Sequence, residues 1–192
     1  MNQGISMLDT LRDFVKRIDG LGVEYMISGS YAMSLYGEIR TTRDIDVVIE
    51  LRREDVLRFA EAFRDEYYVS DDSIRSAVSR RSMFNMVSHE YGGKIDCIIG
   101  KDTDFARESF GRRRRANIAD VEVWVSTKED LIVAKLNWAR DTYSGMQIRD
   151  IANLTDSDYD AEYVEGWIEN LGLEGIWSEV TAWKTQREKT EG

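Results

Sequence analysis

Hydrophobic residues in the first two thirds of the chain alternate between helical and strand spacing. From Leu8 to Ile18 they recur every three or four positions, as on one face of a helix, and two glycines follow. Residues 44–49 first alternate and then become fully apolar, which is typical of a central strand. The pattern predicts strands over 23–27, 44–49, 67–70, 83–88, 94–99 and one or two within 114–125, and helices over 8–18, 32–37, 53–66, from a cap at 71–73 to 81, and 102–111. The turn residues 89–93, with a solvated His89, favour an antiparallel hairpin between 83–88 and 94–99.

From Thr127 onward the spacing is helical only. It predicts helices over 127–141, 147–154, 160–171 and 176–187, and Thr127 with Asp130 fits a capping box at the start of the first. Strands with interspersed helices, followed by helices alone, are typical of the α+β class. We therefore expect a mixed β-sheet core flanked by helices over residues 1–126, and a C-terminal helical region over 127–192 that packs on it.

Composition and charge narrow the functional classes. The 192 residues are 42% hydrophobic and 32% charged, which is a globular composition. Twenty-six Lys and Arg against thirty-six Asp and Glu give a net charge of −10, which disfavours a dedicated duplex-DNA binder. One Cys and one His exclude a disulfide framework and a zinc site of Cys and His. Because no apolar run reaches ~20 residues and no secretory signal is visible, we expect a cytoplasmic protein without a membrane partner.

The strongest chemical signal is Asp44-Ile45-Asp46, at the start of the predicted central strand. Residues i and i+2 of a strand project from the same face, so the two carboxylates point together. Adjacent carboxylates repel and stay ionised together when a cation offsets the repulsion. A hard divalent ion does this, and Mg²⁺ takes one or two protein carboxylates together with substrate phosphates. The alternative is a solvated strand end whose charges prevent edge pairing.

Three neighbouring features strengthen the functional interpretation. Gly29-Ser30 follows a buried strand and opens a short helix, where backbone N–H groups and a hydroxyl suit a phosphate. Asp96 is a lone carboxylate in an otherwise apolar strand, and such a residue is rarely buried without a partner. Arg40 to Arg43 lead directly into the aspartate pair and bring cations and hydroxyls beside it.

The order and spacing of these motifs resemble the nucleotidyltransferase superfamily of the polymerase-β type. Gly29-Ser30 is followed, after thirteen residues, by Asp44-Ile45-Asp46. Arg40-x-Thr42 ahead of the aspartate pair is similar to the form found in nucleotidyltransferase-like toxins of type IV toxin–antitoxin and abortive-infection systems and in their uncharacterised relatives. The likeness spans about residues 22 to 155 and includes the helical segment that contains Lys135.

The resemblance implies metal-dependent transfer of a nucleoside monophosphate from an NTP, such as ATP, to a hydroxyl acceptor, with pyrophosphate as the leaving group. Asp44 and Asp46 would bind two Mg²⁺ ions, for which Mn²⁺ is a substitute. Asp96 would share one ion and act as the general base. Gly29 and Ser30 would hold the β and γ phosphates.

Three further residues are nucleotide-binding candidates by the same resemblance. Arg40 and Thr42 precede the aspartate pair, and Lys135 is a candidate triphosphate clamp because a compact ammonium suits the charge that develops there. Asp150 would orient that lysine. The alternative for Lys135 is a solvent-facing side chain on an amphipathic helix.

The acceptor stays open between RNA such as tRNA, a protein side chain and a small molecule such as an aminoglycoside. A toxin would also have an antitoxin partner. The four adjacent arginines Arg112–Arg115 are either a phosphate-binding patch for the acceptor or a solvated strand edge that pairs with the excess carboxylates. If their strand lies beside that of Asp96, about two of them face the active site.

Two alternatives to this interpretation remain: an antibiotic nucleotidyltransferase, and a relative that binds nucleotide or a partner chain without turnover. The presence of all three aspartates argues against the second. Other conspicuous residues are expected to be structural: Cys97 as a core thiol, and Trp138, Trp167, Trp177 and Trp183 as packing residues of the helical region.

Overall fold

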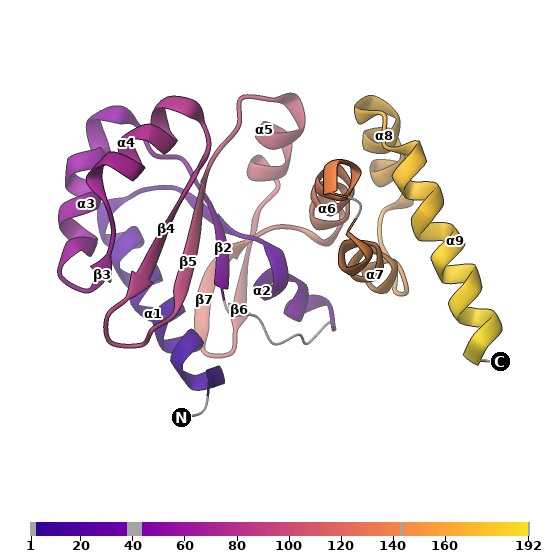
Figure 1. Cartoon of the computed structure of the whole chain (residues 1–192), viewed down its shortest axis with the longest axis horizontal. Coiled ribbons are helices and arrows are strands. Elements are labelled where there is room, and N and C mark those ends of the chain that lie inside the picture. The colour runs from indigo at the N-terminus through magenta and orange to yellow at the C-terminus, as the bar shows by residue number, and fades with distance from the viewer. Residues whose placement is uncertain (1–2, 38–43, 143, 192) are drawn as a thin grey trace. The chain divides into compact units, whose positions relative to one another are not determined.

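The computed structural model describes residues 3–37, 44–142 and 144–191. Their contacts divide into two compact units, one of residues 1–35 and 39–126, and one of residues 127–192 together with 36–38. Figure 1 follows the elements of both units along the chain.

All the described strands belong to the first unit, and the described elements from Thr127 onward are helices. The first unit contains α1 (Gln3–Leu21), β1 (Tyr25–Ile27), α2 (Gly29–Met33), the 3-10 helix η1 (Ser34–Tyr36, its last residue outside the unit), β2 (Asp44–Ile49), the 3-10 helix η2 (Arg53–Asp55), α3 (Val56–Arg64), β3 (Tyr67–Tyr68), α4 (Asp71–Arg80), β4 (Met83–Ser88), β5 (Lys94–Ile99), α5 (Asp104–Gly111), β6 (Arg114–Ile118) and β7 (Val121–Val125). The second contains α6 (Lys128–Thr142), α7 (Gly145–Leu154), α8 (Ala161–Leu171) and α9 (Glu174–Glu191).

The described strands form one mixed sheet in the order β3-β4-β5-β2-β1-β7-β6. β2 pairs with β5, and β1 with β7, in parallel, whereas the other neighbours are antiparallel. The α+β class with a mixed sheet is therefore confirmed, and β2 lies at its centre as predicted. The β4–β5 hairpin is confirmed too, while β3 is shorter than the predicted strand over 67–70.

An aromatic core joins one face of the sheet to α1 and α3. Phe14 of α1 lies 6.2 Å from Tyr25 of β1 and 5.6 Å from Phe63 of α3, measured between ring centroids. Phe59 of α3 lies 5.8 Å from Phe84 of β4. Such ring pairs stabilise a core beyond the burial of their area. Side chains alternate along a strand, so the residues between these core positions face the other side of the sheet, and these include the predicted aspartates.

Two local expectations have different outcomes. Cys97, paired with Phe84 across the sheet, is fully buried as predicted, and burial raises the pKa of its thiol above the ordinary value. The cap of α4 is Ser70 rather than residues 71–73, because the Ser70 hydroxyl accepts a hydrogen bond from the Ser73 N–H at 3.4 Å.

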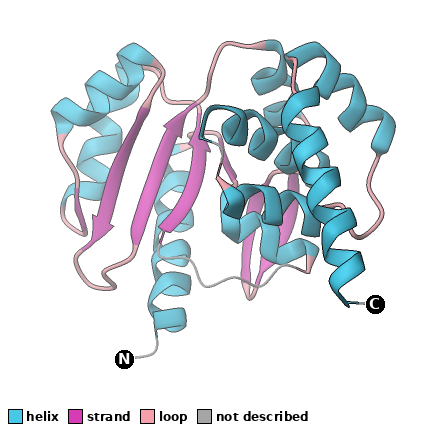
Figure 2. Ribbon diagram, turned by 45° about the vertical axis from the view of Figure 1, so that its right-hand side comes forward, coloured by secondary structure: helices cyan, strands magenta, loops and turns pink. Residues whose placement is uncertain are grey.

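The helical unit begins with the predicted capping box. The Asp130 N–H donates to the Thr127 hydroxyl at 3.2 Å, and the fully buried Asp130 carboxylate accepts from the Tyr163 hydroxyl at 2.6 Å, which ties α6 to α8. Figure 2 shows the helices of this unit. None of the described helices combines the length and the apolar character that crossing a bilayer requires.

One packing prediction for the helical unit is wrong. Trp138 is 56% exposed, although it was expected to pack in the bundle. Leu131, seven residues earlier on the same side of α6, is buried, as are Leu136 and Ala139 on other sides, so the covered part of this side ends before Trp138.

Candidate active site

The register of two parallel strands brings the three predicted aspartates onto one face of the sheet. Asp46 of β2 lies directly opposite Asp96 of β5, and Asp44 lies opposite Lys94. Asp44 and Asp46 are half-buried, whereas Asp96 is buried. The structure therefore places a cluster of carboxylates and one lysine at the start of β2 and β5, as the D-x-D spacing and the lone aspartate predict.

Gly29 packs directly against one of these carboxylates. Its φ of +58° lies in the left-handed region, and a Cβ added there would stand 1.9 Å from Oδ2 of Asp46. The Ser28 N–H donates to the Asp46 carbonyl at 2.9 Å, which fixes the turn between β1 and α2 against β2. Ser30 is the second residue of α2. Only glycine fits at position 29, because any side chain would displace the Asp46 carboxylate.

Two polar side chains hold Asp96 in place. Asn85 of β4 lies opposite Asp96 and donates from Nδ2 to Oδ1 at 2.8 Å. Nζ of Lys94 lies 2.8 Å from Oδ1 and 2.9 Å from Oδ2 of the same carboxylate. The hydrogen bond to Asp96 raises the pKa of Lys94, and the charges of Asp96, Asp44 and Asp46 raise it further.

Sequence reasoning missed the roles of Asn85 and Lys94. A signal existed for Lys94, since it precedes Asp96 by two residues and shares its strand face. Asn85 could not be assigned, because its position depends on the hairpin register.

The donor set of this cluster fits a divalent metal ion. Carboxylate oxygens are the ligands that Mg²⁺ prefers, and the Lys94 ammonium already holds a positive charge among the three carboxylates. Among the described residues no three acidic side chains converge as a ready-made metal group, and the Asp96 carboxylate contacts Lys94 and Asn85. Asp44 and Asp46, with Asp96, are the residues that would hold an ion.

Two predicted nucleotide-binding residues, Arg40 and Thr42, lie outside the described residues. The third, Lys135, belongs to the helical unit and is buried, so it is not the solvent-facing lysine of the alternative interpretation. Its Nζ lies 2.9 Å from Oδ2 of Asp150 and 3.1 Å from Oε1 of Gln147. Asp150 does contact Lys135 as expected, whereas the role of Lys135 toward a nucleotide stays a prediction.

The arginine run does not lie beside the strand of Asp96. Three strands separate β6 from β5, so the geometry that would place two of its arginines at the carboxylates is wrong. The Arg113 guanidinium lies 4.1 Å from the Phe110 ring centroid and 5.1 Å from that of Trp124, and it pairs with Glu24. Arg115 lies 4.6 Å from the Trp124 centroid. These arginines make cation–π contacts and ion pairs within the first unit.

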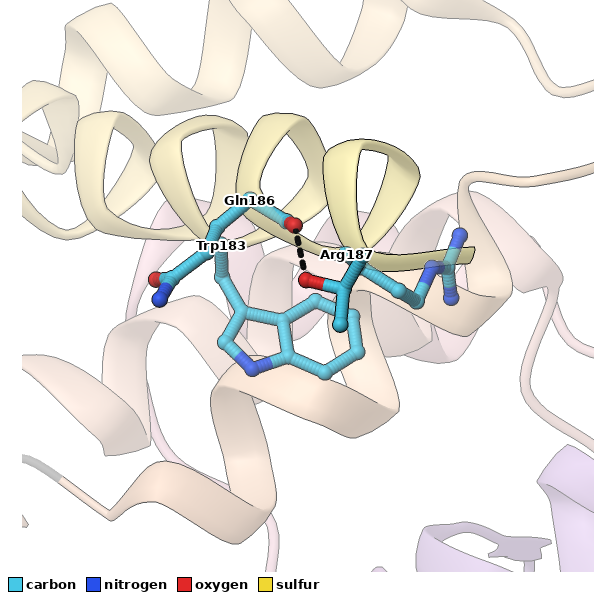
Figure 3. A pocket seen from close by; sticks show the side chains of 4 residues that line it. Trp183, Gln186 and Arg187 are labelled. Carbon is cyan, nitrogen blue, oxygen red and sulfur yellow. Dashed lines mark hydrogen bonds between the residues drawn. The ribbon is translucent and has the colours of Figure 1, made fainter. Parts of the chain in front are cut away.

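A groove in the helical unit carries none of the predicted site residues. Figure 3 shows it along α9, where Trp183, Gln186, Arg187 and Thr190 line a hollow of about 340 Å³. The Arg187 guanidinium lies 5.1 Å from the Trp183 ring centroid and donates to Asp156 at 2.6 Å. The Arg187 guanidinium, the charged group of this groove, is already paired with Asp156. The carboxylate cluster is therefore the stronger candidate for an active site.

Known proteins resemble this chain in structure but not in sequence. No family model matches the chain, and no curated protein sequence matches it significantly. Its structure is similar to an antigenic nucleotidyltransferase-like protein from Paracoccidioides brasiliensis, with a TM-score of 0.53 and 16% identity over 92% of this chain and 93% of that one.

An antibiotic-resistance factor and an antibiotic adenylyltransferase are also similar in structure. The antibiotic-resistance factor ANT(2'')-Ia has a TM-score of 0.52 and 16% identity over 100% of this chain and 97% of its own. The lincosamide antibiotic adenylyltransferase LnuA, bound to lincomycin, has a TM-score of 0.50 and 15% identity over 74% and 92%. These likenesses confirm the nucleotidyltransferase-like fold that the motifs predict.

Proposed function

We propose that this protein is a metal-dependent nucleotidyltransferase that moves a nucleoside monophosphate from an NTP to a hydroxyl group. The observation that carries the proposal is the Asp46–Asp96 pairing across β2 and β5, with Gly29 held against the Asp46 carboxylate. This arrangement gathers hard anionic ligands beside a turn whose backbone approaches closely, as phosphoryl transfer requires. The shared fold supports the same class.

Each residue of the cluster has a role in the proposed reaction. Asp44 and Asp46 hold Mg²⁺, which when bound neutralises the triphosphate and the charge that develops during in-line displacement. Asp96 accepts the proton of the acceptor hydroxyl. The acceptor oxygen forms a bond to the α-phosphorus, the bond from that phosphorus to the bridging oxygen breaks, and pyrophosphate leaves.

Further residues are proposed as ligands of the triphosphate. The backbone N–H groups of Gly29 and Ser30 donate to its terminal phosphates. Lys135, which contacts Asp150 and Gln147 within the helical unit, is proposed as a triphosphate ligand on the strength of the resemblance. Arg40 and Thr42 are proposed as additional contacts on the strength of the motif alone.

A small hydroxylated molecule is the acceptor that we favour over RNA. The arginine run, the densest basic segment, lies at the far edge of the sheet from β5, and Arg113 and Arg115 are engaged in ring contacts and ion pairs. Two structural neighbours are named for antibiotic resistance or antibiotic adenylylation. A toxin role would require an RNA or protein acceptor and an antitoxin partner.

Mass spectrometry after incubation with Mg²⁺ and each isotope-labelled NTP tests the proposal. Parallel reactions contain an aminoglycoside and lincosamide panel, total RNA, or no added acceptor. A product heavier by one NMP on an antibiotic supports the favoured acceptor, and a product on RNA or on the protein itself moves the assignment to those classes. Nucleotide binding without any product would instead favour the non-catalytic alternative.

A further inference from the structure

Lys94 stands where an ion would have to bind Asp96. Its ammonium lies within 2.9 Å of both Asp96 oxygens, and it is paired across the sheet with Asp44. The Asp96 side chain is 10% exposed, whereas that of Lys94 is 40% exposed. One partner is thus fixed in the sheet, and the other has access to water.

We propose that Lys94 is a built-in counter-ion of Asp96, which a divalent metal ion must displace to complete the three-aspartate site. This inference rests on the proposed function and deepens it. Ion binding at Asp96 is then an exchange of one cation for another rather than the filling of an open site.

The geometry of Asp96 explains why the lysine has to move and the asparagine does not. A carboxylate has about four lone-pair positions, so the single hydrogen bond from Asn85 to Oδ1 leaves room for an ion. The Lys94 ammonium contacts both oxygens and repels any second cation at that distance. Its flexible four-carbon stem allows the charge to withdraw into water. Asn85 then remains as the positioning residue that keeps Asp96 oriented.

The exchange has a functional consequence. Without a cation, three neighbouring carboxylates repel one another, and Lys94 offsets this repulsion before the metal arrives. A free divalent ion binds Asp96 only at the free-energy cost of breaking the Lys94–Asp96 ion pair. An ion that carries an NTP brings phosphate ligands, whose binding offsets this cost. Lys94 therefore favours entry of the metal together with the nucleotide.

Electron paramagnetic resonance of free Mn²⁺ tests the exchange on chelator-treated, full-length protein. Lys94→Met removes the competing charge at nearly constant length, and we expect it to tighten Mn²⁺ binding about tenfold. Lys94→Arg keeps the charge and binds a carboxylate bidentately, so it should weaken Mn²⁺ binding. Lys101→Met, at an exposed position beyond the other end of β5, removes the same charge elsewhere and should bind as the wild type does.

Asp46→Asn separates failure of this inference from failure of the proposed function. If Asp46→Asn abolishes Mn²⁺ binding while Lys94→Met binds no more tightly than the wild type, the exchange is overturned and the metal site stands. If Mn²⁺ binding does not depend on Asp46, the proposed function fails and the exchange with it. Should Lys94→Met not fold, Lys94→Arg decides alone, since binding equal to or tighter than that of the wild type overturns the inference.

Discussion

Two lysine–aspartate ion pairs in this protein have nearly the same N···O distance but differ in their exposure to water. Lys94 and Asp96 meet at 2.9 Å on a strand of the sheet, with the lysine 40% exposed. Lys135 and Asp150 also meet at 2.9 Å, but on the helices α6 and α7, with side chains 10% and 7% exposed. An ion pair with access to water contributes little to stability and can be exchanged, whereas a buried pair is costly to break. Exposure, and not the contact itself, therefore decides which of the two pairs we expect to exchange.

Breaking the buried pair should have the largest effect. Asp150→Ala leaves the Lys135 ammonium buried with the Gln147 amide oxygen as its one hydrogen-bond partner among the described residues, and should lower the free energy of unfolding by about 3–5 kcal/mol. Chemical denaturation of the protein, followed by the circular-dichroism signal of its helices, measures this loss of stability.

A double variant separates stability from function at the same pair. Lys135→Met with Asp150→Leu replaces the ions by apolar groups and should recover most of the lost stability. If Lys135 clamps the triphosphate, this stable protein is still deficient in transfer. Full transfer by the double variant would make the pair purely structural.

Asp96→Asn should impair chemistry rather than folding. Loss of the general base lowers the rate of the chemical step by about 10²–10⁴-fold, while binding of the magnesium–NTP complex falls less. Single-turnover kinetics and calorimetry give the two quantities separately. Nucleotide binding that disappears together with transfer would mean that Asp96 acts chiefly as a metal ligand.

Gly29→Ala should lower stability by about 1–3 kcal/mol and reduce transfer disproportionately. The new Cβ would displace the Asp46 carboxylate, to which it would stand at 1.9 Å. Gly22→Ala is the matched control, because Gly22 has a similar φ of +64° with open space around it. Backbone strain is common to both variants, whereas the clash with Asp46 occurs only in Gly29→Ala. Thermal unfolding and activity assays of the two variants should therefore separate the two effects. Equal losses of activity would show that the contact between Gly29 and Asp46 does not matter for transfer.

Lys94→Gln should have the smallest effect on stability, less than about 1 kcal/mol, because this position is 40% exposed and the glutamine amide keeps a hydrogen-bond donor for the buried Asp96 carboxylate. Chemical denaturation of metal-free Lys94→Gln and of Asp150→Ala, each against the wild type, compares the two losses of stability directly. A loss as large as that of Asp150→Ala would show that the sheet pair is as fixed as the helical one.

The sequence predicted the parts of the site that depend on local spacing. The D-x-D pair, the lone Asp96, the glycine turn and the hairpin follow from periods of two residues and from turn composition, and the structure contains each. The capping box at Thr127 is local in the same sense. The catalytic and metal-binding roles of these residues stay predictions.

Long-range pairing could not be predicted in the same way. Asn85 reaches Asp96 only through the β4–β5 register, and the arginine strand lies at the far edge because β7 pairs with β1. Exposure of Trp138 depends on how far along α6 the packing of the helical unit extends, because Leu131 on the same side of the helix is buried. These features depend on tertiary packing, which the local pattern does not encode.

The proposed function assigns nucleotidyl transfer to the aspartate cluster. Its most direct test is pyrophosphate release from each NTP with Mg²⁺ and the acceptor panel, measured for the wild type, Asp46→Asn and the exposed-carboxylate control Asp65→Asn. We predict wild-type turnover for Asp65→Asn, and background release for a folded Asp46→Asn protein, which lacks a metal ligand at nearly constant volume. Normal pyrophosphate release by Asp46→Asn would show that the aspartate cluster does not perform the transfer.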